Sequence, residues 1–270
     1  MASVYPLYEA AREVGGDRIE VRNLAPSGAE PHDLELSPTQ VDALLDADVV
    51  LYVGRGFQPA VEAVVDDRDG GITVDVLAAL TAHLRTQAAE GGDGDQSDPH
   101  VWLDPVLMAR IVEQVRDALA RADPSGASSF ERSSDRYRSE IEALHERFRN
   151  GLSDCGRRVM VTSHAAFGYL AARYGLIQQP IAGISPEAEP DPRRLAELAD
   201  LVRREGVTTV FTETLVSPRV ANTLAREAGV HTAVLNPVEG LSPEEVGRGE
   251  NYVSVMDANL RTLRQALECR

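Results

Sequence analysis

Apolar and polar positions along the first half of the chain switch repeatedly between the 3.6-residue period of helices and the short apolar runs of buried strands. The run DVVLYV over residues 48–53 is rich in β-branched residues and is followed by Gly54, which is typical of a strand buried on both faces. Ser37-Pro38 combines a capping side chain with the proline that begins many helices. The expected segments are a helix over 7–14, an extended stretch over 19–24, a helix from 38, a strand over 48–53, a helix over 59–65 and a strand over 72–76. This alternation predicts a parallel sheet covered by helices.

The middle of the chain contains the longest helical pattern. A glycine- and acid-rich stretch over 88–97 has no apolar period and predicts a surface loop, and Asp104-Pro105 then begins a helix that reaches about residue 122. From 127 to 152 one apolar stripe recurs at helical spacing: Phe130, Tyr137, Ile141, Leu144, Phe148 and Leu152. At 1.5 Å per residue this helix is about 35–40 Å long, enough to span two lobes. An ordinary long surface helix is the alternative.

The second half resumes the alternation of strands and helices. The expected segments are a strand over 159–162, helices over 165–174 and 191–205, a strand over 207–212, a helix over 218–228, a strand over 232–235 and a helix over 252–267. The sequence therefore predicts the α/β class, with two (β/α) lobes that contain parallel sheets. The expected division is an N-terminal lobe over 1–125, a linking helix over 126–153 and a C-terminal lobe over 154–270.

Charge and composition restrict the partners of the protein. The 270 residues carry a formal net charge of -16, which disfavours nucleic acid and anionic lipid because both have the same sign. A cationic ligand suits this charge better. No stretch approaches the roughly 20 apolar residues of a membrane-spanning helix, and no charged and apolar leader precedes Tyr5. The protein is therefore expected either to be cytosolic or to have lost a signal segment.

Three of the six histidines occupy loops in which an α/β protein is expected to bind a ligand, beyond the carboxyl ends of strands. His32 lies in SGAEPHD, His100 in SDPHVWLDP, and His164 follows the strand VMVTS. Neighbouring prolines lower the entropy that is lost when a side chain is immobilised on a metal. Three imidazoles from separate loops can form three corners of a zinc tetrahedron. The remaining histidines, His83, His145 and His231, have ordinary surroundings and are not expected to bind metal.

A carboxylate or water is expected as the fourth ligand. Glu239 follows the strand TAVL in LNPVEGL, at the equivalent loop of the second half, and Glu213 in FTETL is its main competitor. Asp98, Asp104 and Asp33 are close to the histidines in sequence and are candidates either to orient the rings or to cap helices.

Several classes of enzyme lack support in the sequence. The chain contains no Gly-x-Ser-x-Gly, no phosphate-binding glycine loop and no His-Glu-x-x-His, so the signatures of the common hydrolases, nucleotide-binding proteins and metalloproteases are absent. A zinc-dependent hydrolase remains an alternative if water takes the fourth position. The two cysteines, Cys155 and Cys269, are too far apart for a Cys-x-x-Cys motif and form either two buried thiols or one disulfide.

Several motifs give the chain a resemblance to a known family over nearly its full length. They are GAEPHDLELSP, ADVVLYVGRGF, DPHVWLDP, VTSHAAFGYLAARYGL, VFTETLVSPRVANTLAREAGV, NPVEGLSPEE and NYVSVMDANLRTL. On these residues the chain resembles the zinc- and manganese-binding proteins of ABC transporters, the ZnuA-type family. The resemblance implies two lobes joined by one rigid helix, with a metal in the cleft that is delivered to a membrane permease.

The resemblance also implies ligand roles and a location. Family members carry histidine in the third ligand position when they bind zinc and usually glutamate when they bind manganese, so His164 favours Zn²⁺, in agreement with the preference of zinc for imidazole nitrogen. The resemblance implies a non-enzymatic, extracytoplasmic binding protein, in the periplasm or on the cell surface, with a cognate ABC permease. A monomer is expected, and a lipid anchor on the precursor is left open. Secretion in turn favours a disulfide between Cys155 and Cys269. A manganese or iron carrier of the same fold is the alternative. The acidic stretch AAEGGDGDQSD departs from the histidine-rich loop of many zinc-binding members, so we do not expect this loop to gather zinc.

Overall fold

The computed structural model describes residues 1–80, 98–188 and 190–270, which form two compact units. Unit 1 consists of Met1–Ala143 and Val238–Tyr252, and unit 2 of Leu144–Pro237 and Val253–Arg270. His83 and the expected loop over 88–97 lie outside the described residues. Each unit is defined by its internal contacts and contains two separate segments of the chain. The expected division into 1–125, 126–153 and 154–270 therefore stays a prediction.

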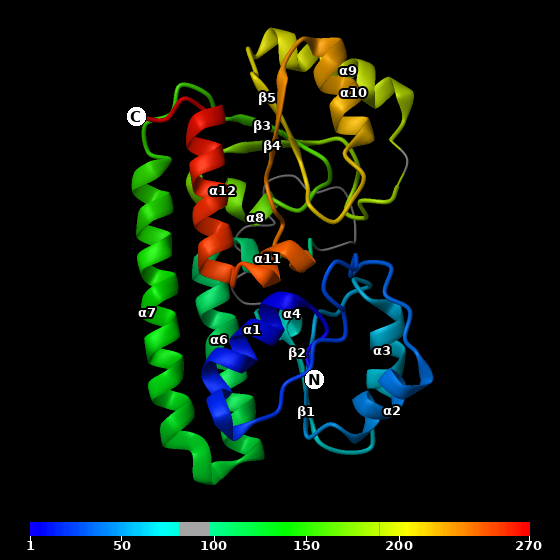
Figure 1. Cartoon of the computed structure of the whole chain (residues 1–270), viewed down its shortest axis with the longest axis vertical. Helices are drawn as coiled ribbons and strands as arrows, with labels where there is room; N and C mark the ends of the chain where they lie inside the picture. The colour runs from blue at the N-terminus through cyan, green and yellow to red at the C-terminus, as the bar shows by residue number, and fades with distance from the viewer. Residues whose placement is uncertain (81–97, 189) are drawn as a thin grey trace. The chain divides into compact units, whose positions relative to one another are not determined.

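Unit 1 contains a small parallel sheet between helices (Figure 1). Strand β1 pairs with β2 in parallel, with Val49 opposite Ile72 and Tyr52 opposite Asp75. Ala2 adds parallel bridges to both Asn23 and Leu51. The elements of unit 1 are α1 (Tyr5–Gly15), η1 (Gly16–Arg18), α2 (Pro38–Asp46), β1 (Val49–Tyr52), α3 (Pro59–Asp66), β2 (Ile72–Asp75), α4 (Val76–Ala79), η3 (Val101–Leu103), α6 (Pro105–Ala122), η4 (Pro124–Gly126) and α11 (Pro243–Gly247).

The helices of unit 1 begin where the sequence provides caps. Ser37 accepts a hydrogen bond from the Gln40 N–H, and the Gln40 side chain accepts one from the Ser37 N–H, a complete capping box at the start of α2. Asp104 accepts from the Val106 N–H and caps α6, so the capping alternative is observed for this residue. Helix α6 packs along α1 and buries its apolar face there.

Unit 2 contains a four-stranded parallel sheet of order β4-β3-β5-β6. Helix α10 packs against β5, and α9 lies beside α10 (Figure 1). A core of aliphatic side chains fills the space between them, including Val161, Leu198, Val202, Val210 and Leu224. The elements of unit 2 are β3 (Val159–Thr162), α8 (Gly168–Tyr174), β4 (Ile177–Pro180), α9 (Pro192–Arg204), β5 (Thr209–Thr212), α10 (Arg219–Ala228), β6 (His231–Val234) and α12 (Tyr252–Ala266), whose first residue belongs to unit 1.

Helix α7 (Ala127–Gly151) is 25 residues long, as the apolar stripe predicts, and contributes residues to both units. Phe130, Tyr137, Ile141, Leu144 and Phe148 are all buried. Parallel strands with covering helices in each unit and one long helix confirm the predicted α/β fold class.

Two local expectations differ from the structure, and one strand was not expected. Helix α8 begins at Gly168 and not at residue 165, because residues 163–167 form the turn that carries His164. Strand β4 (IQQP) has no sequence prediction because it is short, polar and at the edge of its sheet. The stretch 19–24 contributes only the bridge at Asn23.

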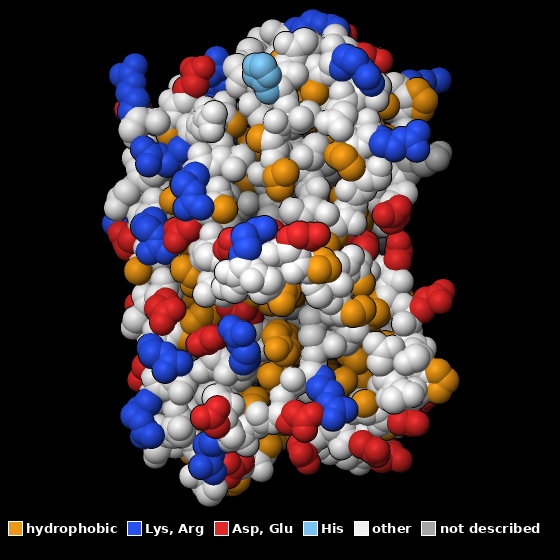
Figure 2. All heavy atoms as spheres, viewed as in Figure 1, with side chains coloured by type: hydrophobic (Ala, Val, Ile, Leu, Met, Phe, Trp, Pro, Cys, Tyr) orange, Lys and Arg blue, Asp and Glu red, His pale blue; other side chains and the backbone are white. Residues whose placement is uncertain are grey.

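The surface carries both signs of charge. On the face shown in Figure 2, arginine and acidic side chains are interspersed, and hydrophobic side chains are visible among them. Among the residues that the structure describes, no helix is long and apolar enough to cross a lipid bilayer.

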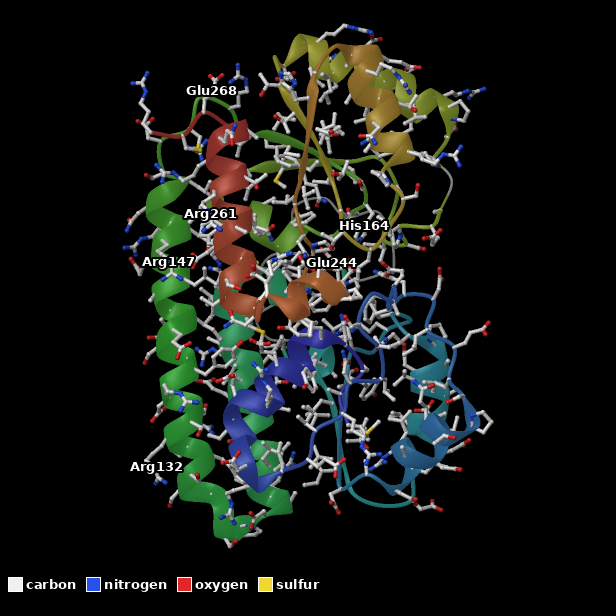
Figure 3. The ribbon with its side chains drawn as sticks, viewed as in Figure 1. Arg132, Arg147, His164, Glu244, Arg261 and Glu268 are labelled. Atoms are coloured by element: carbon white, nitrogen blue, oxygen red, sulfur yellow. A yellow bond between two sulfur atoms is a disulfide. The ribbon has the colours of Figure 1, made fainter. Side chains whose placement is uncertain are left out.

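In unit 2, Cys155 and Cys269 form a disulfide, which confirms that interpretation of the two cysteines over two buried thiols. The bond ties the residues that follow α7 to the end of the chain, close to the salt bridge between Arg157 and Glu268 (Figure 3).

Candidate metal centre

His32 and His100 follow the same local sequence, an acid and a proline. In GAEPHD, Glu30 accepts a hydrogen bond from the His32 N–H at 3.1 Å. In SDPHVW, Asp98 accepts from the His100 N–H at 2.9 Å, an Asx-type turn. The proline restricts the backbone between acceptor and donor, so both histidines stand in preformed turns. The repeated acid-Pro-His pattern is therefore a second sequence signal for these two histidines, in addition to their position in loops.

The two rings are held by further contacts within unit 1. The Pro31 carbonyl accepts a hydrogen bond from the buried Gln58 amide at 3.1 Å, which fixes the backbone next to His32. The His32 ring packs edge-on against Phe57, with ring centroids 4.6 Å apart. The His100 ring packs in the same manner against Trp102 at 5.4 Å. Rings held in this way lose little entropy on binding a metal.

Asp98 also sets the direction of the His100 ring. Its Oδ1 lies 2.7 Å from His100 Nδ1, so in the neutral ring the proton sits on Nδ1 and Nε2 has the lone pair. Of the three acids that the sequence offered either to orient the rings or to cap helices, Asp98 is in contact with the His100 ring. Burial alone would lower the pKa of His100, but the hydrogen bonds and charges of Asp98 and Glu239 outweigh burial and raise this pKa.

Glu239 lies with these two histidines in unit 1. This is a finding that chain order did not suggest, because Glu239 was expected in the equivalent loop of the second half. The His100 Nε2 atom lies 2.9 Å from Glu239 Oε1 and 3.2 Å from His32 Nε2, and His32 Nε2 lies 3.5 Å from the same oxygen. His100 and Glu239 are buried.

These three distances match one face of a zinc tetrahedron. Two ligand atoms of a tetrahedral site are separated by about 1.6 times the bond length, so zinc bonds of about 2.0–2.1 Å require separations of about 3.3–3.4 Å. The observed triangle has edges of 2.9, 3.2 and 3.5 Å. Two unprotonated imidazole nitrogens and a carboxylate oxygen at these distances repel one another unless a proton or a metal cation lies between them. The arrangement is therefore suited to a proton or a metal ion.

His164 lies in unit 2, in the turn that follows β3 (Figure 3). Its carbonyl accepts hydrogen bonds from Thr162 Oγ1 at 2.8 Å and from the Gln178 amide at 2.9 Å, which hold the turn. The ring Nδ1 lies 2.7 Å from Glu213 Oε2, and the backbone N–H of His164 donates to Glu213 Oε1 at 3.2 Å.

Glu213 therefore contacts the nitrogen of His164 that faces away from a metal bound at Nε2. Its position after β5, next to β3 in the sheet, brings a residue 49 positions away into contact with His164. A carboxylate on one ring nitrogen fixes the tautomer and raises the basicity of the other, as Asp98 does for His100. The sequence suggested Glu213 only as an alternative to Glu239 as the fourth metal ligand.

The remaining histidines of the described chain have other contacts. His145 Nδ1 lies 3.0 Å from the Tyr174 hydroxyl. His231 is the exposed first residue of β6, and its backbone N–H donates to the Thr208 carbonyl.

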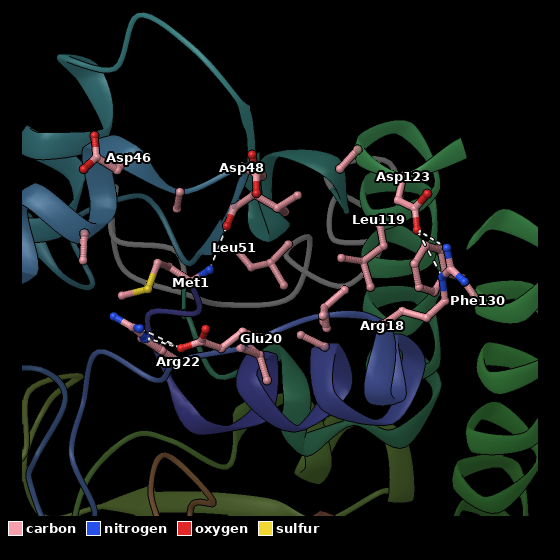
Figure 4. A pocket seen from close by; sticks show the side chains of 17 residues that line it. Met1, Arg18, Glu20, Arg22, Asp46, Asp48, Leu51, Leu119, Asp123 and Phe130 are labelled. Carbon is pink, nitrogen blue, oxygen red and sulfur yellow. Dashed lines mark hydrogen bonds and ion pairs between the residues drawn. The ribbon is translucent and has the colours of Figure 1, made fainter. Parts of the chain in front are cut away.

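A cavity of about 740 Å³ in unit 1 lies elsewhere, at the amino end of β1 (Figure 4). Its walls include Met1, Asp48, Val49 and the ion pair between Arg18 and Asp123. Its lining contains no histidine or cysteine, so it lacks the donors that zinc prefers.

Comparison with known proteins identifies the family of the chain. The family described as zinc-uptake complex component A, periplasmic (ZnuA), matches residues 1–266. The chain is 38% identical over 278 residues to the zinc-binding lipoprotein AdcA of Streptococcus pneumoniae serotype 4, covering 99% of this chain and 55% of AdcA. It is 34% identical to the high-affinity zinc uptake system protein ZnuA of Bacillus subtilis, covering 99% of this chain and 86% of that protein.

The structure is similar to the Zn(II)-bound ZnuA-like domain of Streptococcus pneumoniae AdcA, with a TM-score of 0.83 and 37% identity over 99% of this chain and 97% of that domain. The chain spans about half the length of the AdcA relatives that it matches. With the match over almost all of its residues, the chain belongs to the ZnuA family.

Proposed function

We propose that this chain is the zinc-capturing, solute-binding component of a metal-uptake ABC transporter, and that one Zn²⁺ binds to His32, His100, Glu239 and His164. The observation that carries the proposal is the triangle of two Nε2 atoms and one carboxylate oxygen in unit 1, with edges of 2.9, 3.2 and 3.5 Å. The His164 Nε2 atom is the proposed fourth corner, because Glu213 already occupies the other nitrogen of that ring.

The donor set favours zinc over manganese or iron. Three imidazole nitrogens suit zinc, whereas manganese binds preferentially to carboxylate and water oxygens. The net charge of -16 raises the local concentration of any divalent cation but does not discriminate among cations. The manganese or iron carrier remains the second candidate.

Four protein ligands also favour capture over catalysis. Catalytic zinc sites usually keep three protein ligands and a water, whereas a closed site with four leaves no position for a substrate. If water replaced Glu239 as the fourth ligand, the hydrolase alternative would regain its open position. The short distance between Glu239 and His100 supports the carboxylate.

We also infer an extracytoplasmic location and delivery of zinc to a membrane permease. The support is membership of a family of periplasmic zinc-uptake components, and the disulfide between Cys155 and Cys269, which is typical of oxidising compartments. We expect the binding protein to be monomeric.

A metal titration tests the function. Apo-protein is titrated with Zn²⁺ and with Mn²⁺ against a chromophoric chelator, and the zinc complex is examined by X-ray absorption. We expect one zinc per chain, about three nitrogen ligands and one oxygen ligand at about 2.0–2.1 Å, and weaker binding of manganese. Failure to bind zinc at a stoichiometric ratio would refute the proposal, and tighter manganese binding would establish the second candidate.

A further inference from the structure

The segment that carries Glu239 is held in unit 1 by contacts at both of its ends. The flanking residues, up to Pro237 and from Val253, belong to unit 2, so residues 238–252 leave and rejoin that unit. The first anchor is the backbone N–H of Tyr5, which donates to the Glu239 carbonyl at 3.3 Å. Val238 has a φ of 59°, in the left-handed region that β-branched residues rarely adopt. A backbone in this conformation persists only where surrounding contacts impose it.

The second anchor is the side chain of Glu9. Its Oε1 accepts a hydrogen bond from the Tyr252 N–H at 3.1 Å, at the first residue of α12, where a negative charge is favourable. Its Oε2 accepts a hydrogen bond from the Tyr5 hydroxyl. Tyr5 and Glu9 are one turn apart on α1, so this single turn contacts both ends of the segment.

Glu9 is buried, with an exposed fraction of 2%. Burial raises the pKa of Glu9, although the hydrogen bonds from Tyr5 and Tyr252 and the charge of Arg12 act in the opposite direction. A buried carboxylate is costly to keep away from water unless its hydrogen bonds compensate. The two donors and Arg12 Nη2, 3.7 Å away, supply that compensation.

A third contact lies between the two ends, and only one of its two hydrogen bonds comes from a side chain. The Leu241 carbonyl accepts hydrogen bonds from the Ser27 hydroxyl at 2.8 Å and from the Gly28 N–H at 2.9 Å. These hydrogen bonds hold the backbone two residues beyond Glu239. Removing the Ser27 hydroxyl therefore loosens the segment without altering the core.

We propose that Glu9 is a positioning residue for zinc capture. It acts through Tyr5 and Tyr252 to hold the Glu239 segment, so that the Glu239 carboxylate meets His32 and His100 in the required geometry. The inference rests on the proposed function, in which Glu239 is a ligand. A group that orients a ligand without contacting the metal typically contributes about 10- to 100-fold to metal affinity.

The experiment compares Glu9→Ala, Glu9→Gln and Ser27→Ala with Glu13→Ala, which changes a partly exposed acid on the same helix. Zinc affinity is measured with a competing chelator, and the visible spectrum of the Co²⁺ complex reports the coordination geometry. We expect Glu9→Ala to weaken zinc binding by about 10- to 100-fold and to change the cobalt spectrum. Glu9→Gln, which keeps an acceptor oxygen and the same shape, should restore most of the affinity. Ser27→Ala should cause a smaller loss, and Glu13→Ala should have no effect.

The possible outcomes separate the two proposals. If the wild-type chain fails to bind zinc, the proposed function fails. If it binds zinc and folded Glu9→Ala keeps the wild-type affinity and cobalt spectrum, Glu9 is a structural residue only and this inference is overturned. If Glu9→Ala does not fold, Tyr5→Phe decides, because it removes one hydrogen bond to Glu9 and keeps the ring. An affinity loss in Tyr5→Phe with an altered cobalt spectrum supports the inference, and wild-type values overturn it.

Discussion

Unit 1 and unit 2 orient their proposed imidazole ligands with the same chemistry but through different separations along the chain. In unit 1 the carboxylate on the His100 ring is Asp98, two residues away, in a turn restricted by Pro99. In unit 2 the carboxylate on the His164 ring is Glu213, which the pairing of β3 with β5 brings close. One orientation depends on a local turn and the other on a correctly assembled sheet.

The two carboxylates also differ in their access to water. The Asp98 side chain is 22% exposed, whereas that of Glu213 is 2% exposed. Water can replace part of the lost contact at an exposed position but not at a buried one. We therefore expect zinc affinity to depend more strongly on the buried Glu213 than on the partly exposed Asp98, although each carboxylate orients one histidine ring.

The largest expected effect comes from removing one ligand from each unit. His100→Ala and His164→Ala should each weaken zinc binding by more than the roughly 100-fold that orienting residues reach, because a metal bond is lost outright. Competition titration against a chelator measures both, with His231→Ala as the exposed control. Wild-type affinity in His164→Ala would remove unit 2 from the proposed site.

Loss of the disulfide should distinguish the units next. Replacing Cys155 and Cys269 by Ser should lower the free energy of unfolding by about 2–4 kcal/mol, because the bond closes a long loop in the unfolded chain. Trp102, the one tryptophan, lies in unit 1, so its fluorescence reports unit 1 while circular dichroism reports both units. We expect the dichroism transition to move to lower denaturant and zinc affinity to stay unchanged. Equal shifts of both signals would mean that the two units unfold together.

Changes at the orienting carboxylates should be smaller. Asp98→Ala and Glu213→Ala should each weaken zinc binding by about 10- to 100-fold, with the larger loss for Glu213 because its site is buried. Calorimetric titration of the two variants side by side measures the difference. Equal losses would show that exposure does not matter here, and a larger loss for Asp98 would reverse the comparison.

The last expected effect is that of pH, which changes zinc affinity gradually. The raised pKa of His100 means that the zinc-free protein binds a proton there at a pH where a free histidine would be neutral. Zinc must displace this proton, so affinity should be full above the raised pKa and fall by about tenfold per pH unit below it. The stability that His100 gives the zinc-free protein should change in the opposite direction, being present below the unfolded pKa of about 6.5 and lost as pH rises through the folded value. Zinc affinity that does not vary between about pH 5 and 8 would contradict the assignment of His100.

Several features of the fold and the candidate site follow from the sequence because the forces that produce them are local. The stripe from Phe130 to Leu152 produces α7, and the run over 48–53 produces β1, since period and apolarity act within one element. The acid-Pro-His turns at His32 and His100 are equally local. These features can be predicted from a window of a few residues.

Other features require the folded chain. Glu213 meets His164 only after two strands have paired, and Glu239 belongs to unit 1 only because residues 238–252 leave unit 2. The buried position of Glu9 likewise depends on a hydrogen bond to a residue 243 positions away. No periodicity encodes such contacts, because they arise from the packing of whole elements.

The sequence by itself therefore determined the α/β class, the long helix and the loops in which the three histidines stand. Only the tertiary structure decided which carboxylate joins His32 and His100 and which one orients His164. The physical reason is that backbone preference and apolar period act over a few residues, whereas the geometry of a metal site depends on distances between segments that are far apart in the chain.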